Sequence, residues 1–456
     1  MTNIQSKTVF SLILVSLLSL TACGKTEEAK KVAKPQEKQI QAETWEQFVT
    51  RQIEAHIAAH PQWAVTQGRH EYDGQLPDWS RAAIEKEIAR LHQARDEALA
   101  FADDQMNADM LYQREYMISR IDHDLFWMEK AGLPFRSPQY YFGWMSDSLD
   151  PSAYISLNYA SLEQRMRAFT RYLGNVPRAV GQIRENLAMP MPRTWLQLGI
   201  DSFAGYAAYF RDEVPMVWAA VEDEELQHAF ESANAGAIEA MQGMADWLTE
   251  NLSTATEDFA LGPELFKQML WDTERVDISL QELEAIGRAD MARNLKNLNE
   301  ACAEFAPGVS IQDCFARMSS RKPKDGSVVS ARDQLGEIRK FIVDKDLVSI
   351  PGTEEARVNE SPPYARSNFA YINIPGPWEK NQPSVYYISP PNPAWPEDVQ
   401  ADYVAGEADL LFTSVHEVWP GHFLNFLHAN RASFFYGRVF VGYAYAEGWA
   451  HYTEEM

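Results

Sequence analysis

Two histidines and a glutamate near the C-terminus have the types and spacing of a metal-dependent hydrolytic site. His416 is followed at once by Glu417, and His422 comes six positions after His416. Imidazole nitrogens are frequent ligands of Zn²⁺, and a carboxylate beside them can take a proton from water at the ion. We therefore predict that His416 and His422 bind zinc and that Glu417 is the general base.

The spacing of the two histidines requires a break in the helix that carries them. Helical zinc sites usually place their histidines four residues apart, on one face. At about 100° per residue, His416 and His422 would lie roughly 120° apart around a regular helix. Pro420 removes a backbone donor and clashes with the preceding turn, whereas Gly421 accepts unusual dihedral angles. We therefore predict a bulge or break between Trp419 and His422 that returns His422 to the face of His416.

A third ligand is expected from a second motif, residues 446–452. Glu447 lies 25 positions after His422. Catalytic zinc sites use three protein ligands and leave one position open for water, and we predict that Glu447 is the third. His451 shares the helical face of Glu447 and is expected to contact a ligand or the substrate. A hydrogen-bonded structural histidine is the alternative for His451.

Residues 416–422, followed by residues 447–454, resemble the bacterial domain of unknown function 885 family. That family is similar to helical zinc peptidases of the thimet-oligopeptidase and angiotensin-converting-enzyme kind. The resemblance implies a mainly α-helical, metallopeptidase-like fold with a cleft. It implies that this fold extends from Thr44 to the end of the sequence.

The last residues indicate a truncated chain. Members of the family run well past the second motif, whereas this sequence ends at Met456. Glu454 and Glu455 would also stand in the last turn of a helix, where acidic side chains oppose the helix dipole. We expect that the helix continues in a longer protein and that residues stabilising the transition-state oxyanion lie in the missing part.

The N-terminus has the pattern of a bacterial lipoprotein signal. Lys7 precedes an apolar run over residues 9–20, and small residues come before Cys23. We predict that residues 1–22 are a cleaved signal peptide and that Cys23 is lipidated. An uncleaved membrane anchor is the alternative, although the run is short for a spanning helix. Gly24 favours sorting to the outer membrane of the cell envelope, facing the periplasm.

Composition divides the remaining chain into a tether and a folded domain. Residues 23–42 are rich in Lys, Glu and Gln, which is typical of a flexible tether. Residues 43–456 are the predicted α-helical metallopeptidase-like domain, and a hydrophobic share of 46% for the chain is that of a folded protein. The net charge of −24 argues against a nucleic-acid partner, which requires a basic surface.

Capping patterns predict where several helices begin. Residues 44–47 and 161–164 each have the pattern of a capping box. We expect the second of these helices to end at Gly174, because glycine is a common C-terminal stop. Pro177 would then lie in the first turn of the next helix.

A proline-rich segment between residues 344 and 396 predicts a small β element before the metal-binding helix. Its alternating runs at residues 368–374 and 384–389 predict two short antiparallel strands. Such strands can hold an extended peptide by edge addition. Tyr386 and Tyr387 are candidate substrate contacts that would help to bind the oxyanion, and packing within the sheet is the alternative.

Two further residue pairs have the potential for redox or metal chemistry. In an exported protein, Cys302 and Cys314 can form a disulfide across the turn at residues 306–310. Two buried free thiols are the alternative. His56 and His60 have no carboxylate at metal-binding spacing, and we expect them to be surface histidines.

Together these features predict a zinc metallopeptidase of the cell envelope that hydrolyses short peptides. The membrane contact would be the lipid on Cys23. One alternative is a catalytically incomplete, metallopeptidase-like envelope protein that binds a peptide or a partner protein. Another is hydrolysis of a different amide by the same zinc and the same base.

Overall fold

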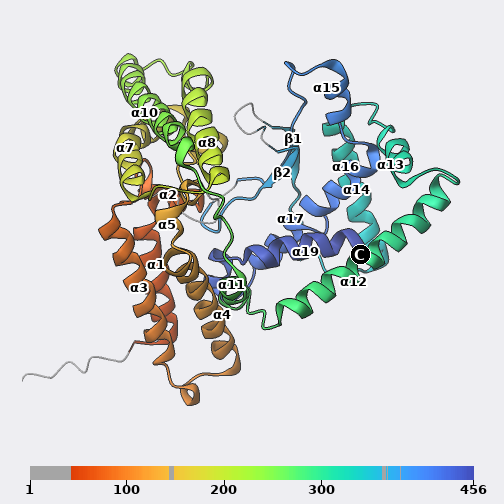
Figure 1. The fold of residues 1–456 in the computed structure, drawn as a ribbon, viewed down its shortest axis with the longest axis horizontal. Coiled ribbons are helices and arrows are strands. Elements are labelled where there is room, and N and C mark those ends of the chain that lie inside the picture. Colours follow the sequence, from red (N-terminus) through yellow and green to blue (C-terminus); the bar gives the residue numbers. More distant parts are fainter. Residues whose placement is uncertain (1–42, 143–147, 362–365, 367, 380–381) are drawn as a thin grey trace, which may run out of the picture. The chain divides into compact units, whose positions relative to one another are not determined.

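Most of the described chain is helical, as the sequence predicted (Figure 1). The computed structural model describes residues 43–142, 148–361, 366, 368–379 and 382–456. The predicted signal peptide, the lipidation site Cys23 and the tether lie outside the described residues. By its internal contacts the chain divides into residues 1–43 and residues 44–456, and all described helices and strands belong to the second unit.

The first helices form a packed group with its own apolar core. They are α1 (Trp45–Ala59), α2 (Pro61–Thr66), α3 (Arg81–Leu99) and α4 (Ala108–Leu125). The predicted capping box is present at Thr44, whose side chain accepts from the backbone of Gln47. The apolar side chains that these helices bury against one another include Trp45, Phe48, Ile53, Ile57, Ile84, Leu91, Met117, Ile118, Ile121 and Leu125.

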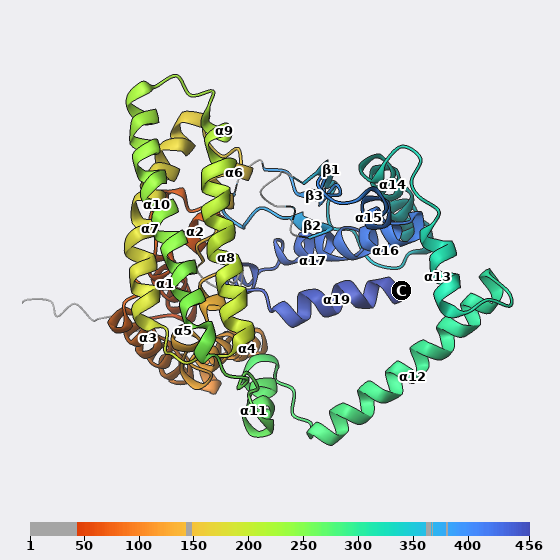
Figure 2. The same ribbon diagram turned by 45° about the horizontal axis from the view of Figure 1, so that its top comes forward.

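Three long helices form a second group (Figure 2). They are α7 (Leu162–Asn186), α8 (Arg193–Asp212) and α10 (Glu224–Glu250). Short helices lie before and between them: α5 (Leu133–Arg136), α6 (Ser152–Ser156) and α9 (Val214–Trp218). Their shared core is aromatic and includes Tyr154, Phe169, Tyr172, Phe203, Phe210 and Trp218.

The predicted end of a helix at Gly174 is wrong. The helix α7 continues through Gly174 and Pro177 and forms one element of 25 residues. An interior proline removes one helical hydrogen bond and costs about 3 kcal/mol. The residues around it, Val176, Ala179 and Val180, are buried in the aromatic core. Burial of this continuous helical face outweighs the cost of the proline. The prediction considered only the preferences of Gly174 and Pro177 and did not include this burial.

The middle of the chain contains α11 (Pro263–Glu274), α12 (Leu280–Phe305), α13 (Ile311–Ser319) and α14 (Ser327–Lys345). Cys302 and Cys314 form a disulfide that joins the end of α12 to the start of α13. Of the two alternatives left open by the sequence, the structure has the bridge.

The described strands form one small sheet, in the order β1-β3-β2. Strands β2 (Ala370–Asn373) and β3 (Val385–Ile388) pair antiparallel, as predicted. Strand β1 (Arg357–Glu360) pairs parallel with β3 and was not predicted. Only Val358 of its four residues is buried, so the strand lacks the alternating apolar pattern that identifies strands in a sequence.

The last helices surround the predicted metal ligands. They are α15 (Glu397–Tyr403), α16 (Glu407–Glu417), α17 (His422–Ala429), α18 (Phe435–Val439) and α19 (Tyr443–Glu455). Helix α19 packs against both α16 and α17 (Figure 2). A third core joins α16, α17 and the turn between them to α14 and the sheet through Ile338, Ile342, Val358, Tyr386, Leu410, Trp419, Phe423 and Leu424. None of the described helices combines the length and apolarity needed to span a membrane.

Candidate metal centre

The two histidines are brought together by a break between two helices. Helix α16 ends at Glu417 and α17 begins at His422. In the intervening turn, the backbone N–H of Gly421 donates to the carbonyl of Val415 at 3.0 Å. A side chain at Gly421 would collide with the backbone carbonyl of His416. The chain therefore requires glycine here because of space, and the break lies where the Pro-Gly pair predicted it.

Three predicted ligands converge on one another across this break. The Nε2 atoms of His416 and His422 lie 3.5 Å and 3.7 Å from Oε2 of Glu447. The two imidazole rings are perpendicular, with centroids 4.8 Å apart. Helix α19 is fixed beside the break because the indole Nε1 of Trp449 donates to the carbonyl of Pro420 at 2.8 Å.

The donor set and its dimensions fit a zinc ion. Four bonds of about 2.0–2.1 Å in a tetrahedron would place neighbouring ligand atoms about 3.3 Å apart. The two His–Glu separations of 3.5 and 3.7 Å are close to that edge. The side chains of His416, His422 and Glu447 are 18%, 13% and 31% exposed, so the group is sheltered but remains open to solvent. Two neutral imidazoles and one carboxylate, with an accessible remaining position, are typical of catalytic zinc sites.

Glu454 was not predicted as part of the site, yet it orients one of the ligands. Its Oε1 lies 2.7 Å from Nδ1 of His416 and 3.1 Å from Nδ1 of His451. A hydrogen bond from Nδ1 of His416 to this carboxylate leaves Nε2 unprotonated and aimed at Glu447. The available sequence signal was the position of Glu454 seven residues after Glu447, on the same helical face.

The acidic residues at the end of α19 both have partners. Glu454 contacts two histidines, and Glu455 forms an ion pair with Arg293 of α12 at 2.9 Å. These contacts account for acidic side chains in the last turn of the helix. His451 is exposed, and its ring lies 5.0 Å from that of His416. The structure therefore places His451 beside a predicted ligand but on the side of Glu454.

Glu417 lies next to the ligands and is half-buried against the sheet. Burial and, to a smaller extent, the charge of Glu447 raise the pKa of its carboxyl to about 7, against the opposing effects of His416 and of a hydrogen bond from the backbone of Ile372. A carboxyl group with this pKa can both accept and return a proton near neutral pH. Ile372 belongs to β2, so this strand runs directly beside the predicted base.

The tyrosines near the centre differ in accessibility. Tyr386 is fully buried in the core, with its hydroxyl 3.5 Å from Oγ of Ser414, so packing is its role in this structure. Tyr387 is half-buried and stacks on Tyr371. Tyr443, which was not predicted, is 38% exposed, and its hydroxyl forms a hydrogen bond with Glu447. Tyr443 precedes Glu447 by one helical turn, a spacing that the sequence contains but that carries no specific signal.

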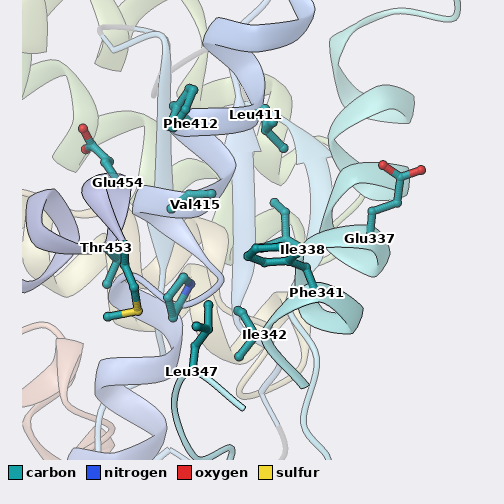
Figure 3. Close-up of a pocket in the computed structure, with 12 residues that line it drawn as sticks. Glu337, Ile338, Phe341, Ile342, Leu347, Leu411, Phe412, Val415, Thr453 and Glu454 are labelled. Atoms are coloured by element: carbon teal, nitrogen blue, oxygen red, sulfur yellow. The ribbon is translucent and has the colours of Figure 1, made fainter. Parts of the chain in front are cut away.

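A cavity of about 370 Å³ lies between α14, α16 and α19 (Figure 3). Its lining is mainly apolar and includes Ile338, Phe341, Leu411, Phe412 and Val415. Glu454 also lines it, whereas Glu417 and the three predicted ligands do not. The cavity therefore lies behind the histidines, on the side of the orienting carboxylate, and differs from the face where Glu417 and β2 meet.

Residues 61–456 match a family model described as "Bacterial protein of unknown function (DUF885)". The chain belongs to the DUF885 family. The match covers the two motifs that carried the resemblance and most of the remaining sequence. The description of the DUF885 family gives no activity, so the relationship to metallopeptidases stays a prediction.

Two solved structures share the fold of this DUF885 chain. One is described as "a putative lipoprotein of unknown function from Shewanella oneidensis", with 20% identity and a TM-score of 0.71 over 91% of this chain and 77% of that chain. The other is "the putative lipoprotein from Colwellia psychrerythraea", with 15% identity and a TM-score of 0.67 over 91% and 78%. None of the curated proteins compared with the sequence matches it.

Proposed function

We propose that this DUF885 protein is a zinc-dependent hydrolase that cleaves peptide bonds in short peptides. The observation that carries the proposal is the convergence of His416, His422 and Glu447 across a glycine-dependent break, with Glu417 beside them. Two histidines and a glutamate are ligands that suit zinc, and a neighbouring carboxyl with a pKa near 7 suits proton transfer.

Each residue has a distinct task in the proposed reaction. When bound, zinc would polarise the scissile carbonyl and lower the pKa of water towards about 7. Glu417 accepts a proton from the attacking water and delivers it to the leaving nitrogen. Glu454 keeps His416 in the tautomer that presents Nε2. Tyr443, whose hydroxyl donates to Glu447 in this structure, would donate to the oxyanion after releasing that bond.

The position of β2 supports an extended peptide as the substrate. Strand β2 lies at an edge of the described sheet, with β3 as its partner on the other side. The backbone N–H of Ile372 points away from β3 and donates to Glu417. A peptide that added to this edge would run past Glu417 with its carbonyl groups near the ligands. Unfolded short peptides can adopt that conformation, whereas the bonds of a folded protein are less accessible.

The proposed location is the cell envelope. The two structural relatives are described as lipoproteins. This description agrees with the signal pattern of residues 1–22 and the cysteine that follows it. We propose that Cys23 carries the lipid and holds the folded unit at the outer membrane, facing the periplasm.

The decisive experiment measures zinc and hydrolysis on the same preparations. Glu417→Gln keeps the shape of the side chain but removes the base, so we expect zinc to remain bound and turnover of a peptide library to fall about 10²–10⁴-fold. Glu407→Gln, an exposed residue at the start of the same helix, is the matched control and should retain activity.

Full turnover by the Glu417→Gln variant would sink the assignment of the base. Zinc retention by the unmodified protein without hydrolysis of any peptide would favour the alternative, a metal-containing envelope protein that binds peptides. Absence of zinc from the protein after exposure to the metal would contradict both.

A further inference from the structure

A second group of metal-ligating side chains lies in the first helical group, on elements other than those of the candidate centre. His56 lies in the last turn of α1, His60 follows the end of that helix, and Glu87 lies on α3. The sequence led us to expect surface histidines with no carboxylate at metal-binding spacing. Both are half-buried in the structure, and a carboxylate contacts His60 from another helix, 27 residues further along the chain.

The three side chains meet with their ligand atoms close together. His56 and His60 are four residues apart, which places both rings on one helical face. Their centroids are 4.1 Å apart, and the rings are stacked at 29°. Nε2 of His60 lies 3.2 Å from Oε1 of Glu87, close to the edge of about 3.3 Å expected between ligands of tetrahedral zinc. One ligand atom from each residue lies within 4.8 Å of the other two.

The surroundings of the group resemble those of ligands rather than of free surface residues. Arg90 donates to Glu87 through Nε at 2.7 Å and Nη2 at 2.5 Å, which fixes the carboxylate. Metal-binding carboxylates are usually held by such outer hydrogen bonds. The rings of Trp63 and Phe440 pack edge-on against His56 at 4.9 and 4.8 Å and shield it from water.

The local charges allow a cation to be added. The guanidinium of Arg90 opposes a positive ion, whereas Glu87 accepts its hydrogen bonds and is negative. A further carboxylate, Asp124, lies close enough to act electrostatically on His56. Asp124 in turn faces Arg120, so the two carboxylates and the two guanidinium groups around His56 balance, and no excess of positive charge opposes a cation.

We propose that His56, His60 and Glu87 bind a second divalent transition-metal ion of the zinc class. The ion takes the place of the hydrogen bond between His60 and Glu87 and binds Nε2 of His60, whose imidazole is then neutral with its proton on Nδ1. The ion would join the end of α1 to α3. It would lie beside Phe440, a residue three positions before the start of α19. The site has a structural role that does not depend on whether the chain is a peptidase.

Zinc stoichiometry tests the proposal without any reference to hydrolysis. The His416→Ala/His422→Ala variant lacks the candidate centre, and after zinc loading and dialysis we expect it to retain about one zinc per chain. Adding His56→Ala and His60→Ala should remove that zinc. Adding His92→Ala should not, because His92 also contacts a carboxylate, Glu129, but belongs to no three-residue group among the described residues.

Two outcomes of the zinc measurement would overturn the proposal. One is a His416→Ala/His422→Ala protein that binds no zinc while retaining its fold by circular dichroism. The other is zinc that persists after His56 and His60 are replaced. Because the quadruple variant is the most vulnerable to misfolding, Glu87→Gln provides a nearly isosteric test in the same background. It should lower zinc affinity and abolish the rise in the thermal midpoint on adding zinc, and an unchanged rise would contradict the proposal.

Discussion

At the scale of single residues, the carboxylate of Glu454 is placed to orient the imidazole of His416, a predicted metal ligand. It lies between His416 and His451 and accepts from the nitrogen of His416 that does not face Glu447. This contact favours the tautomer of His416 that has its proton on Nδ1. The nearby Glu455 faces Arg293 and has no contact with the histidines among the described residues.

We predict that Glu454→Gln weakens zinc binding about 10–100-fold, because a neutral amide fixes the tautomer of His416 less well. Competition with a chromophoric chelator measures the dissociation constant. Glu455→Gln is the matched control, since it removes an acidic side chain from the same turn and should leave zinc affinity unchanged. If the unmodified protein and the two variants bind zinc with equal affinity, Glu454 has no role in zinc binding.

The sequence was sufficient to predict which residues of informative chemical type lie together in the candidate site. His416, His422 and Glu447 were predicted because two imidazoles and an acid at these spacings have few other uses. Glu454 and Tyr443 were not, because a glutamate or tyrosine on a helix is common and its partner is known only after folding. Tyr386 was predicted as a substrate contact, but the structure buries it completely.

At the scale of the elements, the break between α16 and α17 determines whether the histidines can meet. Gly421 occupies the closest approach of the turn to α16, where a side chain has no room. The break was predictable because proline and glycine have strong local effects. The continuity of α7 through Pro177 was not, because it depends on burial against other helices.

We predict that Gly421→Ala lowers the free energy of unfolding by about 1–3 kcal/mol and also reduces zinc affinity, because the turn must move away from His416. Chemical denaturation and zinc titration measure the two effects. Gly287→Ala in α12, where the added atom meets nothing within 4 Å, should be neutral or stabilise by about 0.5–1 kcal/mol. Similar behaviour of the two variants would contradict the steric explanation.

A second prediction at this scale concerns the contribution of the disulfide between α12 and α13 to the free energy of unfolding. Its cysteines are 12 positions apart, and closing a loop of this size contributes about 3 kcal/mol in the chain-entropy treatment. We expect Cys302→Ser/Cys314→Ser to lower the stability of the oxidised protein by that order. A reducing agent should bring the unmodified protein to the stability of the variant and leave the variant itself unchanged. A variant as stable as the oxidised protein would exclude a stabilising bridge.

At the scale of the whole folded unit, His70 connects segments that are far apart in the sequence. Its Nδ1 lies 3.1 Å from Asp73, and its Nε2 lies 2.9 Å from Glu379, which belongs to the connection between β2 and β3. Burial alone would lower the pKa of His70, but the two carboxylates outweigh burial and raise it to about 9. The first helical group is thereby tied to the strand that passes Glu417.

The contacts of His70 with Asp73 and Glu379 make the stability of the fold depend on pH in a defined direction. The folded pKa of His70 is above the unfolded value of about 6.5. Its contribution is therefore complete below pH 6.5, declines between pH 6.5 and 9, and is lost above about pH 9. We predict that His70→Gln loses on the order of 1–3 kcal/mol relative to the unmodified protein at pH 6 and much less at pH 9.5. Urea denaturation at both values gives the difference, and a constant difference would exclude the charge pairing.

Helix α19 carries four of the groups on which the proposed chemistry depends. Glu447 and Glu454 face the histidines from it, Tyr443 contacts Glu447, and Trp449 anchors it to the turn at Pro420. Sliding this helix by one turn, about 5.4 Å, would withdraw a ligand, a hydroxyl donor and an orienting acid in a single step. The geometry of the candidate centre therefore depends on the packing of one helix against α16 and α17.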